Sequence, residues 1–317
     1  MFLEHDFKHI QTCREFTRRR IGHVQIDLAE VEAAGVSVVV NGSYARGEAS
    51  PASDFDYFIL APNNLSTKDS RRIRETIKRV VVAQIGKEPS ADGAFSALET
   101  IGEFAKVIGG QSDTNQQITR RILFLTEGRA VCGQKVFDNE RSKLVSEMYI
   151  REGITDHQLG LFLLNDIIRY WRTICVDFEN KTVQNNKSWG IRNIKLVFSR
   201  KLLYFGGVLI CAEMGQRTLA QKRERALELM KLTPIERLCS VCGHAAKPAL
   251  ADYDYFLSMM EQLEMRAELE AVKEDRGKHP ELFRAMKNRG HHFSMHLINA
   301  VRATYSESHP IHRALIM

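Results

Sequence analysis

The chain has 317 residues, of which 44% are hydrophobic and 26% are charged, and its formal net charge is +6. This composition is typical of a soluble globular protein with one large or two medium domains, and it excludes a low-complexity chain. No apolar run reaches the length of a membrane span, the N-terminus lacks the apolar region of a signal peptide, and the six cysteines follow no framework spacing. We therefore expect a reduced, cytoplasmic protein with no membrane partner.

The first hundred residues begin with a helical pattern and continue with two apolar runs. Residues 7–34 contain no Pro and are rich in Glu, Arg, Gln and Ala, which predicts a helix. The runs Val36–Asn41 and Phe55–Leu60 have the length and the β-branched or aromatic content of buried strands. The connection between them holds two Gly, three Ser and a Pro, which is typical of a turn-rich loop.

The most informative motif spans this loop. Gly42-Ser43 follows the first run, and after ten further residues comes Asp54-Phe55-Asp56. Side chains two apart on a strand project from the same face, so the two carboxylates converge while Phe55 points into a core. Converging carboxylates repel unless a cation lies between them, and their hard oxygen atoms suit Mg²⁺. A Gly-Ser turn allows backbone N–H groups to approach a phosphate closely.

This pattern resembles the nucleotidyltransferase fold of the DNA polymerase beta superfamily. The resemblance implies that Asp54 and Asp56 are catalytic and bind Mg²⁺ or Mn²⁺, and that Gly42 and Ser43 bind phosphates of a nucleoside triphosphate (NTP).

The loop also resembles that of the uridylyltransferases that modify nitrogen-signalling proteins and of their bacterial relatives. The residues that carry this closer resemblance are Arg46-Gly47-Glu48 and Ser50-Pro51-x-Ser53-Asp54. It adds Arg46 to the nucleotide-binding residues.

The superfamily usually completes its site with a third carboxylate, which acts as a base or as a further metal ligand. Asp92 is the best candidate by position, with Glu99 and Asp113 behind it. Asp92 precedes Gly93, and an Asp-Gly pair is also a common turn dipeptide. If none of the three residues completes the metal site, a nucleotide-binding role is favoured over catalysis.

The middle of the chain predicts further elements of the same domain. Ser66 or Thr67 caps a helix that runs to about Gln84 and ends at Gly86, and a third strand is expected within residues 87–98. Residues 108–115 predict a loop and residues 119–129 a helix. Residues 130–137 resemble the segment that closes the catalytic domain of the uridylyltransferase relatives.

From about Arg151 onward the pattern is almost wholly helical. The predicted helices are residues 155–178, 189–214, 217–230, 233–243, 248–275, 279–289 and 291–305. We expect an α/β (α+β) nucleotidyltransferase domain with a mixed sheet, followed by an all-α helical domain. The predicted boundaries are 1–35 for an N-terminal helix, 36–145 for the catalytic domain and 146–317 for the helical domain.

One predicted helix carries a row of polar residues. Arg192, Lys195 and Ser199 share a face, because they lie three and seven residues apart. In template-independent polymerases of the superfamily a Lys and a Ser of the helical domain contact the triphosphate, which implies this role for Lys195 and Ser199. An ordinary basic surface is the alternative reading.

Two other features favour structural readings. Cys239 and Cys242 form one half of a zinc motif, but no second pair at ligand spacing accompanies them, so zinc is not favoured. Tyr170 and Trp171 lie on an apolar helix and are predicted to be core residues.

We therefore expect a metal-dependent nucleotidyltransferase (EC 2.7.7 type) that transfers a nucleoside monophosphate to a hydroxyl and releases pyrophosphate. The acceptor stays open between a protein, an RNA end, a nucleotide and a small molecule, as do the NTP used and the oligomeric state. A catalytically silent nucleotide-binding regulator and a toxin–antitoxin component on the same fold are the alternatives.

A nucleic-acid acceptor is possible but not favoured, because 39 acidic residues interleave with 45 basic ones. If the acceptor is a nucleic acid, the basic clusters to test are Arg18, Arg19 and Arg20, and Arg120 with Arg121.

Overall fold

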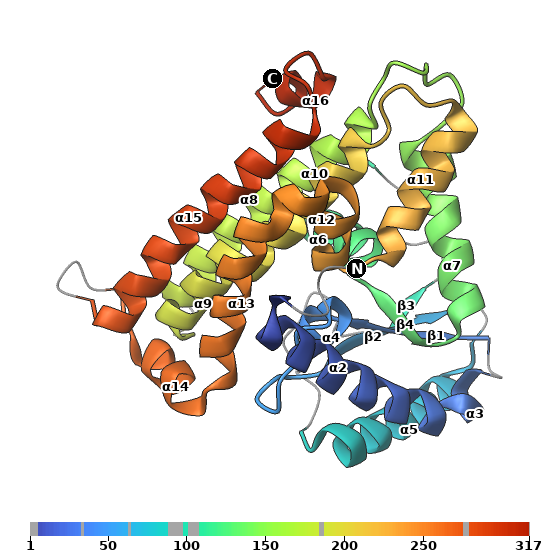
Figure 1. Cartoon of the computed structure of the whole chain (residues 1–317). Coiled ribbons are helices and arrows are strands. Elements are labelled where there is room, and N and C mark those ends of the chain that lie inside the picture. Colours follow the sequence, from blue (N-terminus) through green and yellow to red (C-terminus); the bar gives the residue numbers. More distant parts are fainter. Residues whose placement is uncertain are drawn as a thin grey trace.

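The computed structural model describes residues 6–32, 35–62, 65–87, 98–100, 108–183, 187–274 and 279–316. In Figure 1 the N-terminal α/β part lies at the bottom, and the helical part stands above it. None of the helices within these described residues has both the length and the apolar character that crossing a bilayer requires.

The sheet has four strands in the order β3-β2-β1-β4. β1 (Ser37–Asn41) pairs antiparallel with β2 (Asp56–Ala61) and with β4 (Arg129–Cys132), whereas β2 pairs parallel with β3 (Leu98–Thr100). The sheet is therefore mixed, as the sequence predicted. The predicted runs match β1 and β2 to within one residue, because both are short apolar segments bounded by turn residues.

The sequence analysis missed β4. It predicted a helix over residues 119–129, but α6 (Asn115–Thr126) begins earlier and ends before a strand. A capping box fixes its start, because the Thr114 side chain accepts from the Gln117 N–H at 3.3 Å and the Gln117 side chain bonds back to the Thr114 N–H. The apolar part of β4 is only three residues long, too short for its period to be recognised.

Helices cover both faces of the sheet. The lower face in Figure 1 packs on α2 (Lys8–Asp27), the short α3 (Ala29–Glu32) and α5 (Thr67–Ile85), which contribute Val24, Val31 and Ile77, respectively, to one buried cluster. The predicted cap of α5 is confirmed, because the Ser66 hydroxyl accepts from the Asp69 N–H and Gly86 ends the helix with a φ of 78°.

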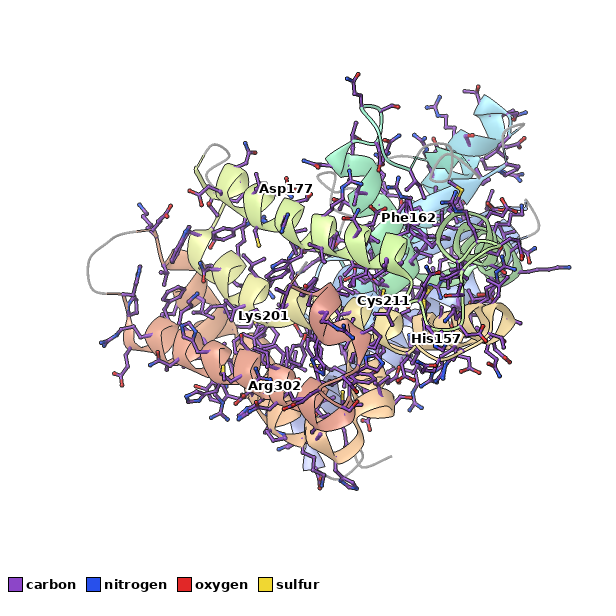
Figure 2. The ribbon with its side chains drawn as sticks, turned by 90° about the horizontal axis from the view of Figure 1, so that it is seen from above. His157, Phe162, Asp177, Lys201, Cys211 and Arg302 are labelled. Atoms are coloured by element: carbon purple, nitrogen blue, oxygen red, sulfur yellow. The ribbon has the colours of Figure 1, made fainter. Side chains whose placement is uncertain are left out.

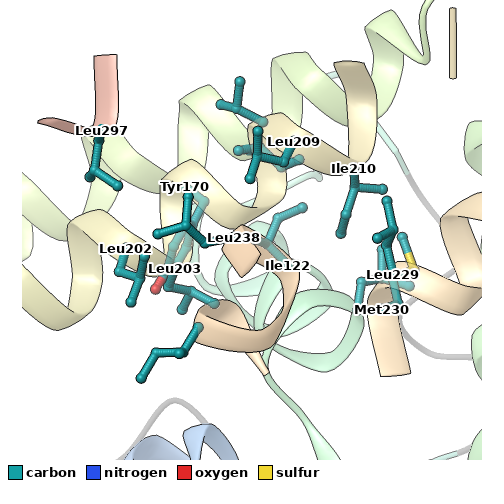
Figure 3. Close-up of a cluster of buried hydrophobic side chains, with 14 of the residues drawn as sticks. Ile122, Tyr170, Leu202, Leu203, Leu209, Ile210, Leu229, Met230, Leu238 and Leu297 are labelled. Carbon is teal, nitrogen blue, oxygen red and sulfur yellow. The ribbon is translucent and has the colours of Figure 1, made fainter. Parts of the chain in front are cut away.

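The upper face packs on α6 and, through it, on the helical part. Val39 and Phe58 of the sheet belong to the same hydrophobic cluster as the bundle residues. Figure 3 shows the centre of this cluster, where Tyr170 and Leu203 lie among apolar side chains of several helices. Tyr170 is buried, as predicted for a core residue, and Trp171 is partly buried against the same core.

The rest of the described chain is helical. Its α-helices are α7 (Gln134–Lys143), α8 (Leu161–Val183), α9 (Trp189–Lys195), α10 (Lys201–Ala212), α11 (Leu219–Lys231), α12 (Pro234–Cys242), α13 (Lys247–Glu261), α14 (Leu263–Ala271), α15 (Glu281–Thr304) and α16 (Pro310–Ala314). Two π-helical segments, η2 (Leu144–Tyr149) and η3 (Leu196–Arg200), and one 3₁₀ segment, η4 (Gly243–Ala246), continue them. Seen from above, α10 with Lys201 lies between α8 with Asp177 and α15 with Arg302 (Figure 2).

Several predicted helix bounds were wrong. The single helix expected over residues 248–275 is divided at Gln262, whose backbone is extended, into α13 and α14. The two helices expected around Gly290 form one helix, α15. Gly290 is a packing contact, because a Cβ there would lie 2.2 Å from Val197 Cγ1. The helix expected over residues 7–34 ends at Asp27, and the one expected from 155 begins at Leu161.

Candidate active site

A cleft lies between the end of the sheet that carries the Gly-Ser turn and the helical part. The empty space beside its lining residues, together with the open solvent at its entrance, is about 810 Å³. Predicted site residues from both halves of the chain line this one cleft: Gly42, Ser43, Arg46, Asp54, Asp56, Lys195 and Ser199. Asp92 lies outside the described residues.

Gly42 begins a tight turn that only glycine can make. β1 ends at Asn41, and the five-residue helix α4 (Gly42–Arg46) follows at once, where the sequence analysis expected a loop. Gly42 has a φ of +68°, and a Cβ on it would lie 2.8 Å from the Asp56 Oδ2 atom. Both the left-handed backbone and the close carboxylate therefore require glycine.

Asp54 and Asp56 lie at the mouth of the cleft. Asp56 is the first residue of β2 and pairs with Asn41, whereas Asp54 precedes the strand. Both are exposed, and Phe55 between them is only 1% exposed, as the alternation predicted. The cleft removes part of the water around Asp56. This loss of hydration, and then the charges of Glu127 and Asp54, raise the pKa of the Asp56 carboxyl to about 6, although Asp56 still meets solvent.

Arg46 is held by two buried carboxylates. Its Nε donates to Glu48 Oε2 at 2.8 Å, and its Nη1 donates to Glu127 Oε1. The other oxygen of Glu127 accepts from the Gly42 N–H at 3.0 Å. Arg46 thus has its charge balanced within the protein, and Glu127 links it to the first residue of the Gly-Ser turn.

Sequence reasoning missed Glu127. The residue follows α6 directly and precedes β4, and it reaches the turn only because β4 pairs with β1. If β4 had been recognised as a strand that pairs with β1, Glu127 would have been expected near the turn.

The helical part contributes the other wall. Lys195, Ser199, Arg200 and Arg266 line the cleft, and they come from α9, η3 and α14. Burial, and then the positive charges of Arg266, Arg200 and Arg46, lower the pKa of Lys195 to about 8. This crowding of cations favours an anionic ligand.

Arg200 was not predicted to line the cleft, and Arg192 was predicted only to share a helix face with Lys195 and Ser199. The sequence analysis assumed an α-helix, in which Arg192, Lys195 and Ser199 share a face. The π-helical turn of η3 inserts one extra residue per turn, and Arg200 lines the cleft while Arg192 is absent from its lining.

An apolar surface continues the cleft beyond these cations. Phe256, Leu257 and Met260 of α13 form it, together with Cys13 of α2. At its edge Glu261 bonds to the His9 ring at 2.8 Å and accepts from the Cys13 thiol at 3.2 Å. A flat ring can lie against such a surface while its phosphates meet the cations.

The candidates for the third carboxylate differ in their position. Glu99 pairs with Leu60 of β2. Leu60 lies four residues from Asp56, and at about 3.3 Å per residue the two positions are roughly 13 Å apart along the strand. Asp113 is buried, accepts from Arg121 at 2.8 and 3.0 Å and from Arg169 at 3.1 Å, and is absent from the cleft lining. Asp113 therefore has a structural role.

The cleft suits a cation that is shared with a ligand. Among the described residues no group of three or more metal-binding side chains occurs, so the protein supplies the two carboxylates of Asp54 and Asp56. Mg²⁺ is commonly bound by one or two carboxylates together with substrate phosphates and water, so these residues fit it. The other pair considered, Cys239 and Cys242, is buried on α12 in the hydrophobic core.

Comparison with known families agrees with this geometry. Residues 27–90 match the family model of the nucleotidyltransferase domain, a stretch that contains β1, the Gly-Ser turn, the aspartate pair, β2 and α5. No curated protein matches the chain significantly. The match confirms that this part of the chain resembles a nucleotidyltransferase domain, which is consistent with the resemblance to the polymerase beta superfamily.

Proposed function

We propose that this protein is a Mg²⁺-dependent nucleotidyltransferase that transfers a nucleoside monophosphate from an NTP to a hydroxyl of an acceptor. One observation carries the proposal: two carboxylates, Asp54 and Asp56, line the same cleft as Lys195 and Arg200. Carboxylates alone would repel a triphosphate, and cations alone would bind any anion. The combination suits an NTP that arrives with a divalent cation.

The residues around the turn would hold the phosphates. The Gly42 N–H is donated to Glu127, so Gly42 would serve by letting a phosphate approach the turn closely, and the Ser43 N–H would donate to a phosphate oxygen. The two aspartates would bind Mg²⁺ (or Mn²⁺). When bound, the cation neutralises charge that develops on the phosphates during transfer. Arg46 has its charge balanced by Glu48 and Glu127, so it acts by holding the turn.

The helical wall would hold the rest of the nucleotide. Lys195 and Arg200 balance the triphosphate charge, and Ser199 between them contacts the nucleotide. The base lies against Phe256 and Met260. The acceptor hydroxyl attacks the α-phosphorus as the bond to pyrophosphate breaks, and Asp92 takes the proton of that hydroxyl.

Labelled nucleotides test this function. The protein is incubated with each α-³²P-labelled NTP and Mg²⁺ or Mn²⁺, alone and with a bacterial extract as the source of acceptors. We expect label to appear on one acceptor class, and we expect the double variant Asp54→Ala/Asp56→Ala to lose transfer with an unchanged circular dichroism spectrum. Full transfer by that variant would overturn the proposal.

A catalytically silent nucleotide-binding regulator is the second candidate. The observation that favours it is that the described residues supply the cleft with only the two carboxylates of Asp54 and Asp56 as a candidate cation site, and with no group of three metal-binding side chains. NTP binding without transfer of label to any acceptor would support it. A toxin–antitoxin role is a special case of the transferase and would show as label on a partner protein or tRNA.

A further inference from the structure

Glu261 is a carboxylate of the cleft to which the proposed function gives no role. It is the last residue of α13, and it lines the cleft together with Met260, which precedes it. Its Oε1 accepts from the Cys13 thiol at 3.2 Å, and Cys13 belongs to the apolar surface of the cleft. The Glu261 carboxylate therefore lies beside the surface against which the proposed function places the base.

The hydrogen bonds of Glu261 leave part of its carboxylate open. Oε1 accepts one bond from Cys13, and Oε2 is bonded to the Nδ1 atom of the His9 ring at 2.8 Å. Each oxygen of a carboxylate has two lone pairs and no proton, so each can accept one further bond. The Glu261 side chain is 23% exposed, which leaves room for a ligand. Glu48, which also lines the cleft, differs because Arg46 balances its charge and its side chain is 2% exposed.

Two kinds of ligand do not suit this carboxylate. A phosphate is negatively charged and would be repelled by it. A metal ion is not indicated, because His9, Cys13 and Glu261 form no metal-binding group, and no group of three such side chains occurs in the part of the chain that the structure describes. A ligand that donates hydrogen bonds does suit it. Beside an apolar surface that accommodates a flat ring, this donor is the polar edge of a nucleobase.

The bases differ in what their edges offer to a carboxylate. Adenine, cytosine and guanine each carry an amino group, which donates hydrogen bonds. Uracil carries two carbonyl oxygens with a single N–H between them. Those oxygens would face the lone pairs of Glu261 on either side of the N–H and repel the carboxylate. The carboxylate therefore favours a base that has an amino group.

We propose that Glu261, held by Cys13 and His9, accepts a hydrogen bond from the amino group of the base and makes the cleft selective for ATP, CTP or GTP over UTP. The proposal rests on the proposed function, since it assumes that the cleft binds an NTP with its base on the apolar surface. It implies a different nucleotide from that of the uridylyltransferases whose loop this chain resembles. Glu261 is the residue that touches the base, and Cys13 and His9 are positioning residues.

Binding measurements test the proposal without any need for turnover. Isothermal titration in Mg²⁺ first compares the four NTPs. The best ligand is then compared with the analogue that lacks only its amino group: purine riboside triphosphate for ATP, inosine triphosphate for GTP, or pyrimidin-2-one riboside triphosphate for CTP. For the wild type we expect UTP and this analogue each to bind roughly tenfold more weakly than the best ligand. A site that hydrogen-bonds an N–H group discriminates against a ligand that lacks it.

Three variants assign the preference to Glu261. Glu261→Ala should bring the Kd values of the best ligand and its analogue to within about threefold, because no acceptor remains. Glu261→Gln should narrow the difference between the best ligand and UTP, because its amide can also donate to a uracil carbonyl. Glu264→Ala is the matched control: it removes the same charge from an exposed position on α14 outside the cleft lining and should keep the full preference. Thermal melting checks the fold of each variant.

The outcomes separate the two ideas. If the wild type binds no NTP at all, the proposed function fails and this inference fails with it. If the wild type binds the four NTPs equally, if UTP binds best, or if Glu261→Ala keeps the full preference, only the inference is overturned.

Discussion

Gly42 is required both by its backbone conformation and by its close contact with Asp56. Its positive φ alone costs an alanine variant on the order of 1 kcal/mol of stability. Its Cβ would also collide with the Asp56 carboxylate at 2.8 Å and displace it. We therefore predict that Gly42→Ala abolishes nucleotide transfer, measured with the labelled NTP.

Gly35 provides the control for this prediction. It has the same φ of +68°, but a Cβ on it would meet nothing within 4 Å. Gly35→Ala should lose a similar free energy of unfolding in urea and keep its activity. Equal activity in both variants would show that the contact between Gly42 and Asp56 is unimportant.

Asp56 also predicts the pH dependence of activity. Its pKa is raised to about 6 by lost hydration and by Glu127 and Asp54, and only its ionised form binds a cation. Transfer should therefore fall as the pH drops through about 6. Because Mg²⁺ competes with the proton, a higher Mg²⁺ concentration should move this acid limb to lower pH. A limb near pH 4 that ignores Mg²⁺ would contradict the assignment.

The raised pKa of Asp56 also affects the stability of the fold. Stability should fall as the pH rises, whereas activity should increase. A carboxyl with a folded-state pKa above its ordinary value of 3.8 binds more protons in the native state, so the wild type loses stability as the pH rises from about 4 to 6. Asp56→Asn removes this loss. Its free energy of unfolding should exceed that of the wild type above pH 6, by a margin that solvent at the cleft mouth keeps small.

At the scale of elements, the π-helical segment η3 places Arg200 in the lining of the cleft, beside Lys195 of α9. Arg200→Ala and Lys195→Ala should each weaken NTP binding by roughly 1.5–3 kcal/mol, the range for hydrogen bonds to charged groups. The matched control is Arg192→Ala, which removes a cation from the same helical stretch but outside the cleft lining. Isothermal titration measures the three Kd values, and an equal loss in all of them would mean that only net charge matters.

The same elements show what the sequence could predict. The turn and the aspartates were recognisable because their chemistry depends on spacing along one hairpin, Gly42 to Asp56. The position of Arg200 in the cleft depends on a change from an α-helical to a π-helical period, which the local sequence does not indicate. Glu127 depends on the pairing of β4 with β1, and the continuity of α15 on the contact of Gly290 with Val197. These are tertiary contacts, which override local propensity.

At the scale of the molecule, the basic clusters considered for nucleic acid do not form one surface. Arg121 is fully buried against Asp113 and Asp166. Arg20 donates to the Gln84 carbonyl at 2.8 Å, while Arg18 and Arg19 are exposed. Nucleic acid therefore stays the less favoured acceptor, and we expect mixed RNA to bind weakly. A nanomolar complex with a steep salt dependence would reverse this preference.

The helical part holds the segment that positions Glu127. Arg237 of α12 donates to the Thr126 carbonyl at 3.0 Å, and Arg141 of α7 donates to the Gly128 carbonyl at 2.6 Å. Both guanidinium groups are buried, and burial lowers the pKa of Arg237 to about 9. Together with the hydrophobic cluster that joins Val39 of the sheet to the bundle, these bonds make the position of Glu127, and through it the Gly-Ser turn, depend on the helices.

We therefore predict that the chain unfolds in one cooperative transition, and that NTP with Mg²⁺ stabilises the whole of it. The lower face of the sheet has a cluster of its own, but the larger cluster joins the upper face to the bundle, so unfolding of either half exposes buried residues of the other. Calorimetry should therefore give equal calorimetric and van't Hoff enthalpies. At a free NTP concentration of about 100 Kd, the gain should be about 2.7 kcal/mol. Asp54→Ala/Asp56→Ala is the control, since it should unfold in the same single step but gain less from Mg²⁺ and NTP together. Two resolved transitions, with only the earlier one moved by the nucleotide, would show that the catalytic domain folds independently of the helices.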